Sequence, residues 1–376
     1  MKDTIRILHM GDVHLDSPFS SLGVDKSESR RRELRGAFTS ILYYAKEKNV
    51  DLVLISGDLF DDGYATGETV DLLCGQFAAQ PDCHFVIAPG NHDPYTRGSL
   101  YASGKLPKNV HVFSSEGLQR FVFEDLNTEV YGWAFCSDTL TASPLAGKRA
   151  DDNGRLHLIC GHCDMASPIS KYCPVTREDV KKFGAHFCGF SHIHKTPEVL
   201  TEDGVTWTYS GFVEGRGFDE CGFGGINYIE AQTSGDFAVK VMRLKTARRR
   251  YMWETLDVGG SGSLAEVAEK IDALIKEKKY ADDTLLRVTL TGAVSPEIEN
   301  TARLESAVRG LYLLEIDDRT SPTFDGGTLE NDMTMRGELY RELLPALSDG
   351  DPAARSVAAA ALKLGLAALE GRNVTE

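Results

Sequence analysis

Two histidines, His192 and His194, stand two residues apart in the segment CGFSHIHKT, directly after a short apolar run. In a β-strand, residues i and i+2 point to the same face of the sheet. Both imidazole rings could therefore converge on one metal ion. They could equally lie side by side on a hydrated sheet face, and the spacing alone leaves both interpretations open.

Polar residues of similar kinds follow four other predicted strands. These four strands, TIRILHM, DLVLIS, HFVIAP and LHLIC, each lead into aspartate, asparagine or histidine, as AHFCGF leads into His192 and His194. Open α/β sheets bind ligands beyond the carboxyl ends of their strands, so we expect these side chains to meet at one place. Turn formation explains glycine, asparagine and aspartate there, but none of the histidines. In chain order the residues are Asp12, His14, Asp58, Asn91, His92, Asp93, His162, His192 and His194.

The order of these segments, D-x-H, G-D, G-N-H-D, G-H and H-x-H, resembles that of the calcineurin-like metallophosphoesterases. Within that superfamily, HMGDVHLDSPF, SGDLFD, PGNHDP and SHIHK are most similar to the SbcD-type DNA-repair exonucleases. The resemblance implies an α/β fold: a four-layer sandwich of two mixed β-sheets flanked by helices, with a small α/β capping domain and C-terminal helices. The order of predicted strands and helices agrees with such a sandwich.

The resemblance also implies a centre of two divalent metal ions. Imidazole and carboxylate ligands suit manganese, iron or zinc better than magnesium or calcium, and we expect manganese. Two such ions clamp a phosphate and produce a hydroxide nucleophile at neutral pH. Asp58 would bridge both ions, with Asp12, His14 and His194 on one of them and Asn91, His162 and His192 on the other.

Two residues of the G-N-H-D segment have no metal in this scheme. His92 resembles the family's general acid, which stabilises or protonates the leaving oxygen, and Asp93 would orient its ring. A second interpretation makes His92 a structural residue behind the ligands. Tyr95 and Arg97, just after this segment, are predicted to contact the substrate.

The chain departs from the family pattern at Ser191, where a glycine usually precedes the first histidine of H-x-H. A serine Cβ there either crowds the loop or is tolerated. Asp61 and Asp62 would repel a polyanion unless they bind metal or support a ligand. Cys160 and Cys163 form a C-x-x-C pair, which can indicate redox chemistry. It follows a strand instead of opening a helix, so we expect small buried residues.

Composition limits the class of protein. The chain has 376 residues, 42% apolar and 26% charged, which is ordinary globular composition and favours two or three domains. A net charge of −15 argues against coating nucleic acid by bulk attraction. Arginines nevertheless cluster at residues 30–32 and 35 and at residues 248–250. Each cluster alone is expected to be a hydrated face.

The pattern of predicted strands and helices changes twice along the chain. We predict a catalytic domain over residues 1–247, a small α/β capping domain over 248–325 and a helical segment over 326–376 that could bind a partner. Residues 319–331 read as a linker with proline and paired glycine. No apolar run reaches the roughly 20 residues that cross a bilayer, and the N-terminus lacks the features of a signal peptide. We therefore expect a cytoplasmic protein without a membrane partner.

Three functions fit these observations. The first is a metal-dependent phosphodiester hydrolase, a DNA exonuclease or endonuclease in DNA repair. The second is a phosphatase or phosphodiesterase acting on small molecules or phosphoproteins, which fits the shared motifs equally. The third is a scaffold subunit of an ATPase complex. The family resemblance implies DNA and an SbcC-like SMC-type ATPase subunit as partners, and a homodimer.

Overall fold

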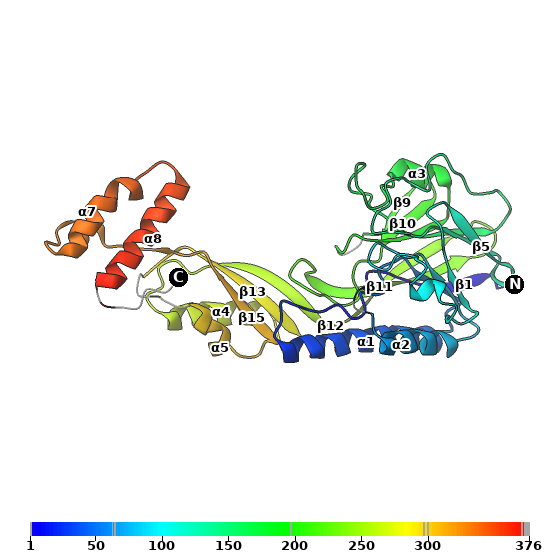
Figure 1. The fold of residues 1–376 in the computed structure, drawn as a ribbon, viewed down its shortest axis with the longest axis horizontal. Coiled ribbons are helices and arrows are strands. Elements are labelled where there is room, and N and C mark those ends of the chain that lie inside the picture. Colours follow the sequence, from blue (N-terminus) through cyan, green and yellow to red (C-terminus); the bar gives the residue numbers. More distant parts are fainter. Residues whose placement is uncertain are drawn as a thin grey trace. The chain divides into compact units, whose positions relative to one another are not determined.

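The computed structural model describes residues 2–61, 63, 65–195, 198–295, 298, 301–369 and 371. The chain divides into two compact units, Met1–Arg250 and Tyr251–Glu376, which are described separately. Figure 1 shows their helices and strands. The three-segment division expected from the sequence, with boundaries after residues 247 and 325, stays a prediction.

The first sheet of the first unit is built around the buried strand β1 (Thr4–Met10). Its strand order is β12–β11–β1–β2–β3–β4. β11 is antiparallel to β1, whereas β2, β3 and β4 follow in parallel, so these strands end at the same edge. The bounds are β2 (Leu52–Ile55), β3 (His84–Ile87), β4 (Val110–Val112), β11 (Gly222–Gln232) and β12 (Val239–Asp257), which continues into the second unit.

The second sheet has the order β5–β6–β7–β8–β10–β9. Its four central strands are parallel, and β5 and β9 are antiparallel at the edges. The bounds are β5 (Gln119–Phe123), β6 (Thr128–Gly132), β7 (Leu156–His162), β8 (Phe187–Ser191), β9 (Leu200–Glu202) and β10 (Val205–Tyr209). β9 was not predicted. It pairs with β10 through Asp203 and Gly204, both with positive φ, which form a tight hairpin turn.

The two sheets pack face to face around a shared apolar core. Ile7 of β1 and Leu54 of β2 belong to the same buried cluster as Val130, Leu158 and Phe187 of the second sheet. Helices cover the outer faces (Figure 1): α1 (Val24–Glu47) and α2 (Gly67–Ala78) lie on the first sheet, and α3 (Arg177–Phe183) packs on the second. Two mixed sheets flanked by helices confirm the predicted fold class.

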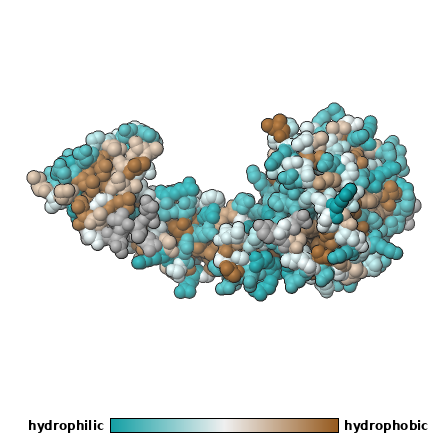
Figure 2. All heavy atoms as spheres, viewed as in Figure 1, coloured by the Kyte–Doolittle hydropathy of each residue, from teal (hydrophilic) through white to brown (hydrophobic). Residues whose placement is uncertain are grey.

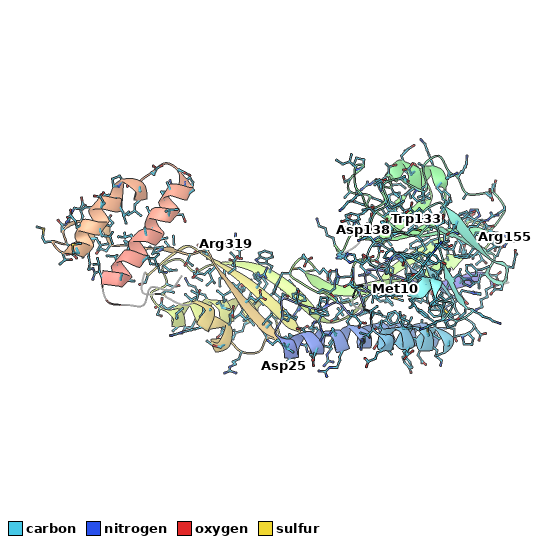
Figure 3. All side chains as sticks on the ribbon, in the orientation of Figure 1. Met10, Asp25, Trp133, Asp138, Arg155 and Arg319 are labelled. Atoms are coloured by element: carbon cyan, nitrogen blue, oxygen red, sulfur yellow. The ribbon has the colours of Figure 1, made fainter. Side chains whose placement is uncertain are left out.

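Local sequence signals place several of these elements. A capping box begins α3, since Thr176 accepts from the backbone of Asp179 and the Asp179 side chain returns to Thr176. Trp133, after β6, is fully buried in the interior of the first unit (Figure 3), and its indole donates to the carbonyl of His162. This contact joins the core to the end of β7. Short 3₁₀ turns occupy η1 (Leu100–Ala102) and η2 (Glu124–Leu126).

The second unit has its own α/β core. Its sheet has the order β15–β13–β12, and buried residues of α4 such as Ile271 pack with Leu286 and Val288 of β13. A short helix, α6 (Gly326–Glu330), occupies the segment predicted as a linker, because Asp325 caps its N-terminus. The other elements are α4 (Leu264–Lys278), β13 (Thr284–Thr291), β14 (Ala293–Val294), η3 (Thr301–Arg303), α5 (Leu304–Ala307), β15 (Leu313–Asp318) and β16 (Ser321–Pro322).

The predicted pair of C-terminal helices is present as α7 (Met335–Leu347) and α8 (Pro352–Leu369). Leu362 and Leu366 of α8 are buried in a cluster to which Leu339 and Leu343 of α7 contribute. Within the described residues, α8 has the length and apolar composition of a membrane-crossing helix, which the sequence analysis did not anticipate. That is weak evidence for a membrane, because core helices of soluble proteins meet the same description.

Candidate metal centre

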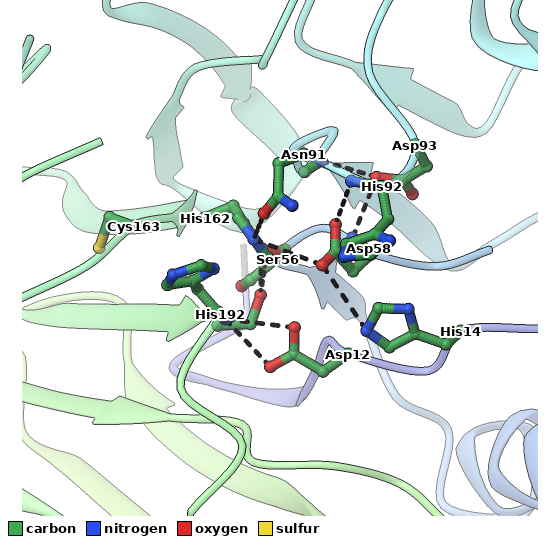
Figure 4. Close-up of polar contacts among 12 residues, drawn as sticks. Asp12, His14, Ser56, Asp58, Asn91, His92, Asp93, His162, Cys163 and His192 are labelled. Atoms are coloured by element: carbon green, nitrogen blue, oxygen red, sulfur yellow. Dashed lines mark hydrogen bonds and ion pairs between the residues drawn. The ribbon is translucent and has the colours of Figure 1, made fainter. Parts of the chain in front are cut away.

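The predicted residues meet at the carboxyl ends of β1, β2, β3, β7 and β8 (Figure 4). Carboxylate and imidazole atoms lie within 4.8 Å of one another in the group Asp12, His14 and His194 and in the group Asp12, Asp58 and His162. Asn91 joins the second group, since its Oδ1 lies 2.9 Å from His162 Nε2. His192 joins through its ring, whose centroid is 5.1 Å from that of His162.

Asp58 lies between the two halves of the site. Its Oδ2 is 3.6 Å from His14 Nε2 and 3.5 Å from His162 Nε2. Its other oxygen, Oδ1, accepts a hydrogen bond from the backbone N–H of His92 at 2.9 Å. A carboxylate that faces one imidazole from each half has the position that a bridging ligand needs.

Three of the histidines are oriented in the same way. Each has its Nδ1 against an oxygen and its Nε2 toward the carboxylates of the site. The Nδ1 partners are Asp61 Oδ1 at 2.7 Å from His14, the Ser56 carbonyl at 3.1 Å from His162 and Glu220 Oε1 at 2.8 Å from His194. Because carboxylate and carbonyl oxygens only accept, Nδ1 carries a proton in each ring, which leaves Nε2 as the atom that would bind a metal. Metal-binding histidines are typically held in this way.

The Nε2 atom of His14 shows that a cation fits. It is buried and has no hydrogen-bond partner among the residues that the structure describes, although the Asp58 carboxylate lies 3.6 Å away. A buried polar atom without a partner costs free energy unless something else satisfies it. A divalent cation between the imidazole lone pair and the carboxylate would do so. The donor set of the centre therefore fits a metal ion of the manganese, iron or zinc type.

At two residues of the site, neighbouring charges shift the pKa in the direction opposite to the effect of burial. Burial alone would raise the pKa of the Asp12 carboxyl, but the imidazoles of His194, His162 and His14 hold it well below its usual range. Burial would lower the pKa of His194, but the Asp12 and Glu220 carboxylates raise it to about 10. Burial and the neighbouring His162 lower the pKa of His192 to about 4. His192 is thus neutral at pH 7, whereas His194 would have to release a proton in order to hold a metal.

Asp61 links a predicted metal ligand to the predicted general acid. Its Oδ1 lies 2.7 Å from His14 Nδ1 and 3.4 Å from His92 Nδ1. The hydrogen bond to Asp61 is the main cause that raises the pKa of His92, with burial opposing it. The His92 side chain is 53% exposed, so its imidazole faces the solvent beside the ligands. Asp62, the second aspartate noted in the sequence, lies outside the described residues.

The structure corrects the predicted role of Asp93, which was expected to orient His92. The Asp93 carboxylate is fully buried and turns back toward the loop after β2. It accepts hydrogen bonds from the backbone of Asp58 at 3.0 Å, Leu59 at 2.7 Å and Gly90 at 2.7 Å, and from the Tyr101 hydroxyl. Asp93 therefore fixes the backbone that carries Asp58, and Asp61 contacts His92 instead.

The two predicted substrate residues differ in surroundings. The Tyr95 side chain packs against the core between the sheets, and its backbone N–H donates to the Phe135 carbonyl at 2.7 Å. Arg97 is exposed. Substrate contact by either residue stays a prediction.

Comparison with known proteins agrees with this geometry. Residues 5–215 match the family model described as calcineurin-like phosphoesterase. The chain belongs to this family. The phosphoesterase is 26% identical over 310 residues to an uncharacterized metallophosphoesterase, YhaO, of Bacillus subtilis. The match covers 79% of this chain and 74% of the relative.

Two further relatives are named as a DNA-repair protein and a nuclease subunit. Over 350 residues the phosphoesterase is 24% identical to the DNA double-strand break repair protein Mre11 of Halobacterium salinarum, covering 86% of this chain and 79% of the relative. A stretch of 92 residues is 34% identical to the SbcD component of the nuclease SbcCD of Escherichia coli, 24% of this chain and 21% of the relative. The family identifies the chain as a metal-dependent phosphoesterase.

Sequence reasoning missed two residues of this phosphoesterase, Arg216 and Glu220. Glu220 is buried, and its Oε1 receives His194 Nδ1 at 2.8 Å and Arg216 Nη2 at 2.6 Å. Arg216 Nη2 also lies 3.2 Å from His194 Nδ1. Because Nδ1 cannot donate to Glu220 and accept from Arg216 together, the shorter bond to the carboxylate sets the tautomer. Both residues follow β10, another parallel strand, so the strand-end rule that found the ligands could have found them.

The departure from the family pattern at Ser191 is accommodated. The Ser191 hydroxyl donates to the Ser56 carbonyl and lies 3.0 Å from His162 Nδ1, so it helps to hold that ring. A Cβ at Gly11 would lie 2.6 Å from the Cβ of Ser191, so the two positions cannot both carry side chains in this packing. Cys160 and Cys163 are buried and free. Burial raises the pKa of the Cys160 thiol to about 12, which leaves no reactive thiolate.

Several predicted ligands have backbone conformations that L-residues rarely adopt. The φ angles are 48° at Asp12, 49° at His14, 52° at Asp58 and 103° at His192. Such conformations persist only where the surroundings fix them, and each costs about 1–3 kcal/mol. Here the two ligand loops hold each other, since Asp12 N donates to Gly57 O at 3.0 Å and His14 N donates to Asp58 O at 2.9 Å.

Proposed function

We propose that the chain is a phosphodiesterase with two metal ions that cleaves DNA in the cytoplasm, with manganese as the metal. The observation that carries this proposal is the common orientation of His14, His162 and His194, whose Nε2 atoms face the carboxylates of Asp12 and Asp58. The Mre11 relative, a DNA double-strand break repair protein, and the SbcCD relative, a nuclease subunit, support DNA as the substrate, at low identity or over a short stretch.

The residues divide into holding and proton-transfer roles. Asp12, His14, Asp58 and His194 would hold one ion, and Asp58, Asn91, His162 and His192 the other. Ions bound there supply charge that polarises a phosphate and lowers the pKa of water. His92, which is partly exposed, would donate a proton from its Nε2 to the leaving oxygen. Asp61 would hold the ring in place through its contact with His92 Nδ1 and favours the charged form that has this proton to give.

The second unit supports a further part of the proposal, a partner ATPase of the SMC type. Figure 2 shows apolar residues on the surface of the C-terminal helices. Met333 before α7, Met335 in α7 and Val357 in α8 are 93%, 68% and 70% exposed. Exposed apolar side chains on a helical pair favour docking of another apolar surface. A homodimer of this chain is a separate expectation that a sedimentation experiment would test.

One experiment separates the candidate functions. Purified protein is stripped with a chelator, reloaded with Mn²⁺, and given an end-labelled DNA duplex, bis-p-nitrophenyl phosphate and p-nitrophenyl phosphate. We expect Mn²⁺-dependent release of nucleotides that Asp58→Asn abolishes and that His92→Gln lowers by about 10²-fold or more. Asp82→Asn removes an exposed carboxylate before β3, at the end of that strand opposite the ligand Asn91, and serves as the control.

The outcomes discriminate between classes. Turnover of p-nitrophenyl phosphate without degradation of any DNA would favour the phosphatase and refute the DNA substrate. Hydrolysis that persists in Asp58→Asn would refute the proposed centre. Binding of a partner ATPase by a chain that hydrolyses nothing with any metal would favour the scaffold.

A further inference from the structure

The two arginine clusters that the sequence separates by more than two hundred residues lie together in the first unit. Arg30 of α1 is fully buried and donates to Glu214 Oε1 at 3.1 Å and to the Gly215 carbonyl at 2.9 Å. Arg249 of β12 donates to both oxygens of Glu33, with contacts of 2.7 and 2.9 Å. The clusters are therefore not two independent hydrated faces. They form one braced structure between α1 and β12.

A groove of about 500 Å³ lies between these two elements, here called the arginine groove. Arg32 of α1 and Arg248 of β12 line it as exposed cations, and the Arg248 side chain is 72% exposed. Gly36 and Ala37 form its floor. A Cβ added at Gly36 would meet no atom within 4 Å, so the floor is open to a ligand.

The arginine groove carries a local surplus of positive charge. Four guanidinium groups (Arg30, Arg32, Arg248 and Arg249) face two carboxylates (Glu33 and Glu214) among the residues that line or brace it. Both carboxylates are occupied: Glu33 by Arg30 and Arg249, and Glu214 by Arg30 and the backbone of residues 248 and 249. In a chain with a net charge of −15, such a surplus at one groove favours an anionic ligand.

The arginine groove is connected to the metal centre by a short loop. Glu214 and Gly215 brace Arg30 on the groove side. The next residue, Arg216, lies 3.2 Å from His194 Nδ1 in the centre. Residues 214–216 therefore run from the brace of the groove to the edge of the centre, so the groove and the centre share one loop of the first unit.

We propose that the arginine groove binds the phosphate backbone of a nucleic acid strand whose scissile phosphate lies in the metal centre. This inference rests on the proposed function and names the path of its substrate. A small phosphate ester needs only the centre, whereas a polymer uses a second, extended set of cations. The groove residues Ser29 to Ser40 span about 16 Å of helix, the rise of about five nucleotides of one strand. Guanidinium groups match phosphate oxygens in charge and geometry.

Two kinds of variant test the arginine groove. Arg32→Glu/Arg248→Glu reverses its exposed cations, and Gly36→Glu places a carboxylate on its floor without removing an arginine. The matched controls are Gly36→Ala, which leaves the floor open, and Lys148→Glu/Arg149→Glu, which makes the same charge change on the exposed loop that precedes β7. Binding of a fluorescent DNA duplex is followed by anisotropy at several salt concentrations in EDTA. Turnover of bis-p-nitrophenyl phosphate is measured separately with Mn²⁺.

We expect the double reversal to weaken binding equally for duplexes of different sequence. The slope of log affinity against log salt should fall by about 2, since two phosphate contacts are lost. Gly36→Glu should also weaken binding, the controls should bind as wild type, and turnover of the small diester should persist in all variants. If the double reversal loses small-diester turnover through misfolding, Gly36→Glu decides, because it replaces a helical glycine by a better helix former.

Other outcomes overturn the inference and separate it from the proposed function. Unchanged DNA affinity in both groove variants would exclude the groove as a DNA-binding site without contradicting DNA cleavage. If the wild-type chain turns over the small diester but binds no DNA, both DNA as the substrate and the groove as its binding site are refuted. Competition by polyglutamate for the groove, with DNA affinity unaffected in the variants, would assign the groove to an acidic protein segment.

Discussion

Glu220 lies outside the ligand set, yet the metal affinity of the centre should depend on it. Its carboxylate accepts the Nδ1 proton of His194 at 2.8 Å and is itself held by Arg216 Nε at 3.0 Å. Burial would raise the pKa of Glu220, but His194 and Arg216 hold it well below its usual range, so it is a carboxylate at neutral pH. Glu220→Gln keeps the size of the side chain and removes the charge that orients the ring.

The expected effect concerns one of the two ions. Loss of a carboxylate that orients a metal-binding histidine weakens metal affinity about 10–100-fold, or about 1.4–2.8 kcal/mol. His194 belongs with Asp12 and His14, so the ion on this side should bind more weakly. The ion held by Asn91, His162 and His192 should keep its affinity, because no contact of Glu220 with those residues is found in the described part of the chain.

Calorimetric titration of the chelator-stripped protein with Mn²⁺ measures both affinities. Glu129→Gln is a suitable control, since it also removes a buried carboxylate, one that is bonded to Tyr131 and Asn153 away from the centre. It should lower thermal stability without moving either Mn²⁺ affinity. Equal Mn²⁺ affinities in Glu220→Gln and wild type would refute the positioning role. Equal weakening of the binding of both ions would indicate a general loss of structure instead.

Contacts in the first unit lead to three further predictions. Asp61→Asn should lower kcat about 10²-fold and move the basic limb of the pH–rate profile to lower pH, because Asp61 is the main cause that raises the pKa of His92; an unchanged profile would contradict this. Gly11→Ala should weaken Mn²⁺ binding, since its Cβ would lie 2.6 Å from Ser191 Cβ, and a second change, Ser191→Gly, should restore it; failure of that rescue would place the strain elsewhere. Burial lowers the pKa of His9 to about 3, so below pH 6.5 the unfolded chain takes up a proton that the folded chain does not bind. The contribution of neutral His9 to stability is therefore lost as pH falls. Between pH 6.5 and 5, the free energy of unfolding measured by urea in EDTA should fall by about 2 kcal/mol less in His9→Gln than in wild type. An equal fall in both proteins would refute this.

Most of the longer strands were readable from the sequence because they carry an apolar run before a polar break, whereas their order within the sheets came only from the structure. The same pattern located the ligands, since their positions are fixed by the ends of parallel strands. Several short elements were missed, and two of them show the local reasons. β9 is a three-residue edge strand with little apolar content, and its Asp203-Gly204 turn was the available signal. α6 is a five-residue helix in a segment whose proline and glycines indicate a loop.

Side-chain partners beyond the ligands could not be read in the same way. Asp61 is three residues from Asp58, but only the folded loop shows that its carboxylate reaches both His14 and His92. Asp93 was assigned to its neighbour in sequence, whereas its bonds run to the backbone of another loop. The joining of the two arginine clusters depends on packing of β12 beside α1. Contacts between segments so distant in the chain leave no mark in a single sequence.

The left-handed conformations of the ligand loops have a consequence for the history of such a protein. Glycine adopts positive φ without cost, so replacing Asp12, His14 or Asp58 by glycine would relieve backbone strain while removing a metal ligand. Selection for folding alone would then act against the centre. In a lineage freed from the need to hydrolyse, we expect glycine to appear first at these positions, with the apolar core unchanged. A screen for thermostable variants without an activity filter would reproduce that decay in the laboratory.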